Sequence, residues 1–90
     1  MPYIKQEDRK KYERLLTRFV EIFSMVPEEK RAGELNYLIT SMTHLALGIK
    51  PNYRMYNEMI GVLESVKLEL YRREVSPYED TKIKENGDVI

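Results

Sequence analysis

Three glutamates on two predicted helices have the residue type and spacing of a metal site. Glu34 lies near the start of a helix predicted over residues 33–47, and Glu58 and Glu64 lie in one predicted over residues 52–75. Carboxylates from neighbouring helices can converge on Mg²⁺, which prefers oxygen ligands and often bridges substrate phosphates. We therefore hypothesise that these three residues bind magnesium, the one cofactor considered. Three carboxylates by themselves are weak evidence for a metal site, because the chain contains twelve glutamates.

A tight crossing between helices is the favoured explanation for the same region. Gly61 lies in the middle of a predicted helix, where glycine costs about 1 kcal/mol relative to alanine. Close approach of another helix would compensate for that cost. Asn36 and Asn57 would then hydrogen-bond across the crossing, because buried polar groups must be paired.

A basic region near the C-terminus could receive a phosphate, with Arg72 and Lys82 as the candidate ligands. Arginine beside tyrosine can bind a phosphate or a nucleic-acid base. Acidic residues are interleaved with these cations, and spacings such as that of Glu69 and Arg73 are those of ion pairs on one helix face. A solvated, ion-paired face is the favoured interpretation.

Most other catalytic schemes lack the residues they need. The chain has one histidine and no cysteine, so disulfides and thiolate zinc sites are excluded. It also has no glycine-rich phosphate loop. His44 has neither an orienting acid nor a nucleophile at a suitable spacing. We expect His44 to be a partly exposed or core-edge residue.

The charge balance argues against a protein whose main task is to coat nucleic acid. Lysine plus arginine is 15 and aspartate plus glutamate is 15, whereas phosphate neutralisation needs a concentrated positive surface. The first five residues lack the apolar core of a signal peptide, and no apolar run approaches the roughly 18–20 residues that cross a membrane. We expect a cytoplasmic protein without membrane association. Abundant Glu, Lys and Arg lean towards a heat-adapted source.

Apolar residues at three- and four-residue steps predict an all-α fold, a compact bundle in a single domain over residues 1–90. Its helices are predicted at residues 6–25, 33–47, 52–75 and 77–86. Gly48 and Gly87 are expected to end helices, and Asn52 to cap one. The sequence Ser76-Pro77-Tyr78-Glu79 is typical of a capping box that begins a new helix.

The helix predicted over residues 52–75 carries apolar residues around much of its circumference. Such a helix is expected to be central or to contact a second copy of the chain. A chain of 90 residues buries only about 60–65% of its unfolded surface, so its stability margin is thin and self-association would help. We expect a homo-oligomer, most simply a dimer.

Several longer motifs resemble a family of small uncharacterised proteins of bacteria, archaea and phages. The likeness covers nearly the whole chain, at residues 1–9, GELNY at 33–37, IGVLE at 60–64, KLELYRR at 67–73 and YED to ENGDV at 78–89. No established activity comes with this resemblance.

A fainter resemblance is to the MazG-like all-α nucleoside triphosphate pyrophosphatases. Those proteins bind Mg²⁺ through Glu-x-x-Glu on one helix and Glu-x-x-Asp on the next, and they form dimers or tetramers. Glu34 and Glu58 match the first acid of each motif, whereas Tyr37 and Gly61 replace the second acids. The resemblance therefore implies either a Mg²⁺-dependent pyrophosphohydrolase acting on nucleotides or a relative that kept the scaffold and lost the site.

Two functions from different classes follow. The first is a self-associating binding or scaffold domain of unknown target. The second is the Mg²⁺-dependent nucleoside triphosphate pyrophosphohydrolase, with Glu34, Glu58 and Glu64 on the metal and Arg72 or Lys82 on the phosphates. A nucleic-acid-associated regulator depends on the basic region alone.

Overall fold

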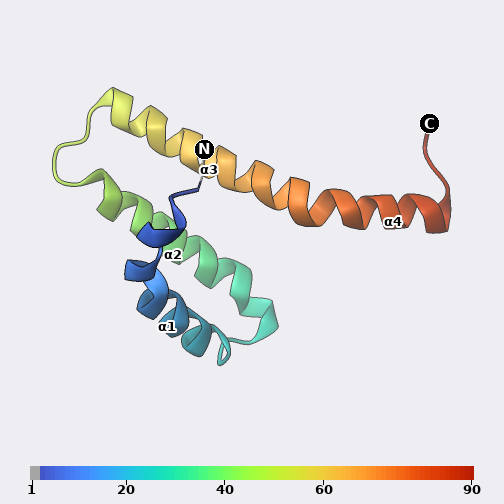
Figure 1. Cartoon of the computed structure of the whole chain (residues 1–90), viewed down its shortest axis with the longest axis horizontal. Coiled ribbons are helices and arrows are strands. Elements are labelled where there is room, and N and C mark those ends of the chain that lie inside the picture. The colour runs from blue at the N-terminus through green and yellow to red at the C-terminus, as the bar shows by residue number, and fades with distance from the viewer. Residues whose placement is uncertain (1–2) are drawn as a thin grey trace. The chain divides into compact units, whose positions relative to one another are not determined.

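The structure, a computed structural model, describes residues 3–90 (Figure 1). Met1 and Pro2, which begin the predicted N-terminal motif, lie outside the described residues. The described chain is helical and contains no strand, so the all-α prediction is confirmed. It divides into two compact units, residues 3–51 and residues 52–90, each with its own helices. The single domain over residues 1–90 stays a prediction. None of the described helices combines the length and the apolar character needed to cross a membrane.

Residues 3–51 form two α-helices and three short 3-10 turns. In chain order these are η1 (Gln6–Asp8), η2 (Lys10–Tyr12), α1 (Glu13–Phe23), η3 (Glu28–Lys30) and α2 (Arg31–Leu47). The first α-helix begins at Glu13 rather than near Gln6, so the predicted range of 6–25 is too long at its start. Arg9, Lys10 and Lys11 would place three cations in the first turns of the longer helix, where the helix dipole disfavours positive charge.

The turn between α1 and α2 holds one of the most buried side chains of the described chain. Phe19 and Phe23 stack on α1 with ring centroids 4.3 Å apart. Val26 follows them and is only 8% exposed. Pro27 then adopts an extended ψ of 145°, which ends the helical path. The Arg31 side chain donates a hydrogen bond from Nε to the Val26 carbonyl at 3.4 Å, so the start of α2 is linked to the turn.

Local capping signals place three helix ends where the sequence predicts them. Gly48 follows α2 with a φ of +79°, a conformation that a residue with a side chain rarely adopts. Asn52 precedes α3 (Tyr53–Leu70), and its side-chain oxygen accepts a hydrogen bond from the Met55 amide at 2.9 Å. Gly87 ends the last helix with a φ of +86°.

Residues 52–90 contain one continuous helical rod followed by a short tail (Figure 1). The rod consists of α3, the π-helical turn η4 (Tyr71–Val75) and α4 (Ser76–Asn86). The predicted capping box at Ser76 is wrong, because Val75 and Ser76 both have helical backbone angles and no side chain caps this junction. Pro77 has no amide hydrogen to donate to the preceding turn, and in a regular α-helix its ring would clash with the carbonyl four residues earlier. A wider π-turn relieves this clash. The helix therefore passes through Pro77 without breaking.

Candidate functional site

The three candidate magnesium ligands are exposed glutamates on different helices. Glu34 lies in the first turn of α2, and Glu58 and Glu64 lie on α3. The Glu58 carboxylate accepts from Arg54 at 2.7 Å, and the Glu64 carboxylate pairs with Lys67 at 3.0 Å. Within residues 3–90 no group of three or more acidic or histidine side chains is arranged to hold a metal ion. The magnesium site stays a prediction, since Glu34 belongs to a different unit from the other two glutamates.

The candidate phosphate ligands form ion pairs along their own helix. Arg72 Nη2 lies 2.7 Å from the Glu69 carboxylate, and Lys82 Nζ lies 3.1 Å from that of Glu85. The Lys82 ammonium also lies over the ring of Tyr78, at 5.5 Å from its centroid. Such pairs on an exposed helix face are worth about 0.3–0.5 kcal/mol each, so a phosphate could displace them. The arrangement agrees with the solvated face that the interleaved charges predict.

The polar residues of the expected helix crossing have open surroundings. A Cβ atom added to Gly61 would meet no neighbouring atom within 4 Å in the described structure. The Asn36 side chain accepts from Thr40 at 3.2 Å along its own helix. Gly61 shares one side of α3 with Asn57 and Glu64, at steps of three and four residues. A crossing at Gly61 therefore stays a prediction.

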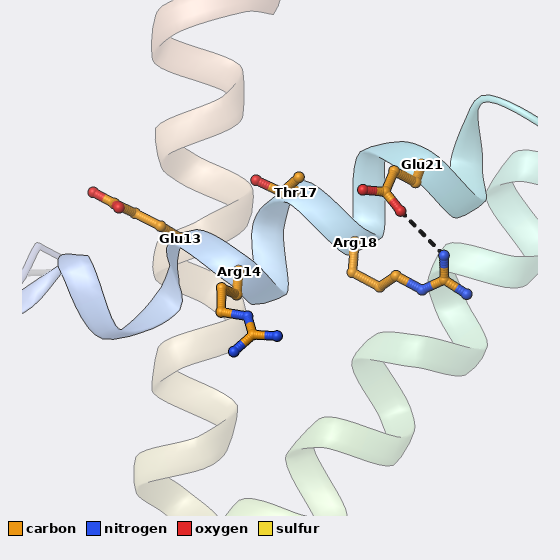
Figure 2. A pocket seen from close by; sticks show the side chains of 5 residues that line it. All are labelled: Glu13, Arg14, Thr17, Arg18 and Glu21. Atoms are coloured by element: carbon orange, nitrogen blue, oxygen red, sulfur yellow. Dashed lines mark hydrogen bonds and ion pairs between the residues drawn. The ribbon is translucent and has the colours of Figure 1, made fainter.

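His44 is exposed on α2, and the sequence predicts it at the surface or at the edge of the core. The polar side of α1 is similarly open to solvent. Figure 2 shows five of its side chains, with Arg18 reaching towards Glu21. They border a shallow hollow of about 560 Å³, and the Arg18–Glu21 ion pair measures 3.1 Å. The side chains of this pair are 69% and 57% exposed, so they are an ordinary surface ion pair.

A small apolar cleft lies within residues 3–51, between α1 and the first turns of α2. It has a volume of about 260 Å³ and is lined by Phe19, Ile22, Phe23, Gly33, Glu34, Tyr37 and Leu38. Its two helices supply aromatic and aliphatic side chains but only one carboxylate, that of Glu34. This composition is typical of a core gap that another apolar surface can fill.

The most extensive candidate site is an apolar surface on α3, here called the α3 apolar face. At about 100° per residue its members cover roughly half of the helix circumference. They are Tyr53, Met55, Tyr56, Met59, Ile60, Val62, Leu63, Val66 and Leu70. Met55 and Met59 are half-buried, and the other seven are exposed, for example Ile60 at 67%.

Residues 52–90 contain nothing that could cover this face. No side chain of α3, η4 or α4 is buried. A helix with one apolar side must bury it against another element to be stable. Exposed apolar patches larger than a few hundred Å² mark interaction sites. The α3 apolar face can therefore bind another apolar helix surface.

The π-turn is bridged by a side-chain hydrogen bond that sequence reasoning missed. The Tyr71 hydroxyl donates to the Glu79 carboxylate at 2.8 Å, across eight residues of the rod. In a regular α-helix residues eight apart lie about 80° apart around the axis, and the extra residue of a π-turn reduces that angle. Because the sequence predicts that Glu79 caps a helix, its hydrogen bond with Tyr71 was not predicted.

This hydrogen bond predicts a shifted titration of Tyr71. Glu79 raises the pKa of Tyr71 above its ordinary 10.0, first by accepting the hydrogen bond and second by its negative charge. Because the pKa is raised in the folded state, the stabilisation is present below pH 10.0 and is lost as the pH rises through the raised value. Glu79→Gln is expected to return the pKa of Tyr71 towards 10.0.

The measurement is an NMR titration of the tyrosine ring carbons, with the Tyr71 signal assigned from Tyr71→Phe. Glu85→Gln is the matched control, because Glu85 pairs with Lys82 and does not touch Tyr71. An unchanged Tyr71 titration in Glu79→Gln would show that the hydrogen bond is absent in solution.

The comparisons with known proteins show one family. A model of a domain of unknown function, DUF6899, matches residues 1–89. The chain belongs to the DUF6899 family. This agrees with the resemblance to a small uncharacterised family. No curated protein and no solved structure matches the chain significantly.

Proposed function

We propose that this DUF6899 chain is a self-associating helical binding or scaffold domain whose working form is a homo-oligomer, most simply a dimer. The supporting observation is the exposed α3 apolar face in a unit that consists of a single helical rod. A second copy presents an identical apolar surface of the same length. In a closed twofold pair each copy covers the other with the same residues.

The size of the face sets the expected strength of the pair. The 18 residues of α3 make a cylinder about 27 Å long and about 11 Å across. Half of its side in each copy amounts to roughly 900 Å² in total, between crystal contacts below about 800 Å² and stable complexes above about 1,200 Å². We expect a dimer that forms in the micromolar range.

The magnesium-dependent pyrophosphohydrolase is not supported to the same degree. Its three carboxylates are exposed, and two of them pair with a cation on their own helix. No specific observation on the described residues favours it over the binding domain, and it stays a prediction from the MazG-like resemblance.

The test is the mass of the full chain by light scattering over a micromolar concentration series. The expected mass is twice 10.8 kDa, and it should persist in about 1 M salt, where charges are screened within about 3 Å. A mass of 10.8 kDa at every concentration would mean that α3 is covered within its own chain, and the proposal would be wrong. Dissociation by salt would point to a charged interface instead.

A further inference from the structure

The two parts of the helical rod differ sharply in the charges that border the α3 apolar face. Between Tyr53 and Val66 the charged residues are Arg54, Glu58 and Glu64. At about 100° per residue Arg54 and Glu58 lie in the polar half of the helix, and Glu64 lies beside Tyr53 at the border of the apolar face. The Arg54–Glu58 ion pair of 2.7 Å is thus on the polar side. The apolar face is free of charge along this whole stretch.

The remainder of the rod is rich in charge. From Lys67 onward half of the residues up to Asn86 are ionisable acids or bases, namely Lys67, Glu69, Arg72, Arg73, Glu74, Glu79, Asp80, Lys82, Lys84 and Glu85. In a parallel twofold pair every residue near the seam, the line along which the two helices touch, lies beside its own copy. Like charges would therefore meet along the second half of the rod. Like charges placed opposite one another are destabilising.

The π-turn also limits a parallel seam. Residues 71–75 widen the helix and change the angular position of every later side chain. A heptad pattern with Tyr56, Leu63 and Leu70 at one seam position, and Met59 and Val66 at the other, therefore ends at the end of α3. The regular seam is confined to the uncharged stretch.

We propose that two copies of this chain pair antiparallel through their α3 apolar faces, with Tyr56 opposite the partner's Val66 and Met59 opposite the partner's Leu63. This inference rests on the proposed function, and it names the partner surface and its direction. The twofold axis then passes close to the level of Ile60 and Val62. The charged part of each rod extends beyond the start of the other copy's α3.

The flanks of this pair are compatible in charge. In an antiparallel seam each flanking position faces the same position of the other helix. Ile60 and Val62 then lie near their own copies around the axis, where both are apolar. Lys67 comes to the level of the partner's Tyr53, where an ammonium over an aromatic ring is favourable by about 0.5–1 kcal/mol. No two like charges are brought together within the overlap.

Disulfide trapping tests the direction, because the chain contains no cysteine. The antiparallel pair brings Tyr56→Cys of one copy next to Val66→Cys of the other, within the Cβ separation of about 4 Å that a disulfide requires. In either single variant the two cysteines lie about 15 Å apart along the axis. We expect the mixed disulfide to form in large excess over either self-disulfide, because only the mixed pair meets that distance criterion.

The matched control is a second pair on the polar side of α3, Asn57→Cys mixed with Ser65→Cys, which should form little disulfide. Efficient self-disulfide in Tyr56→Cys would overturn the antiparallel direction in favour of a parallel one. If the wild type is a dimer by light scattering and the mixed pair does not form a disulfide, the interface is elsewhere and the inference is wrong. If the wild type is a monomer, the proposed function itself fails.

Spin labels at a distant exposed position give a measurement that does not disturb the seam. Lys84 lies on α4, about 23 residues from the axis, so labels on Lys84→Cys should be about 70 Å apart in the antiparallel dimer. A parallel pair, with helices about 10 Å apart, would keep the labels within roughly 30 Å. A short distance in a confirmed dimer overturns the inference.

Discussion

Leu63→Glu is expected to convert the dimer into a monomer throughout the micromolar range. Leu63 is 38% exposed in the chain and lies at the centre of the α3 apolar face. Burial of a leucine contributes about 1.5–3 kcal/mol, and a twofold pair loses this contribution twice. The dissociation constant should rise by about a thousandfold or more, since each factor of ten corresponds to about 1.4 kcal/mol. Sedimentation or light scattering measures this change directly.

Leu68→Glu is the matched control, with the same substitution five residues further along α3. Leu68 is 58% exposed and shares the polar side of α3 with Asn57, Gly61 and Glu64. It should dimerise like the wild type. Equal dissociation by both variants would mean that the effect is a general loss of helix, which circular dichroism would reveal. Retained dimerisation in Leu63→Glu would exclude the α3 apolar face as the interface.

Val26→Asp is expected to unfold residues 3–51 to a large extent. Val26 is 8% exposed, and a carboxylate placed there would lose most of its contact with water. The cost should be about 3 kcal/mol or more, which in urea moves the midpoint by roughly 1–3 M for a small protein. Loss of the near-ultraviolet signal of the aromatic residues, followed through a urea titration, measures the change.

The neighbouring Met25→Asp is the matched control for this substitution. Met25 is 84% exposed, so an aspartate there remains hydrated and should change the midpoint little. If Val26→Asp is as stable as Met25→Asp, the turn between α1 and α2 is more open in solution than the structure shows.

Helix ends were predictable where one residue decides them. Gly48 and Gly87 stop helices because their positive φ angles are costly for any residue with a Cβ atom. Asn52 begins α3 because its side chain can satisfy a free amide of the first turn. Each of these helix ends depends on atoms within a few residues of one another along the chain, and such local interactions can be predicted from the sequence.

The same local reading failed at Ser76 and Pro77. Serine and proline with a glutamate two residues after the proline normally start a helix. Here α3 already precedes them, and extending a formed helix is more favourable than starting a new one. A π-turn absorbs the proline, and Glu79 accepts from Tyr71 instead of capping. Competition between a cap and an existing helix cannot be decided from the motif alone.

The sequence by itself determined the all-α class, the helix ends at Gly48, Asn52 and Gly87, and the apolar side of α3, because all three follow from periodicity and capping along one chain. Only the tertiary structure decided that Val26 and Leu47 are the buried apolar residues within residues 3–90. Burial depends on which side chains meet in space. An apolar stripe in the sequence identifies the side of a helix that has to be buried. The fold determines which other surface of the protein is available to cover it.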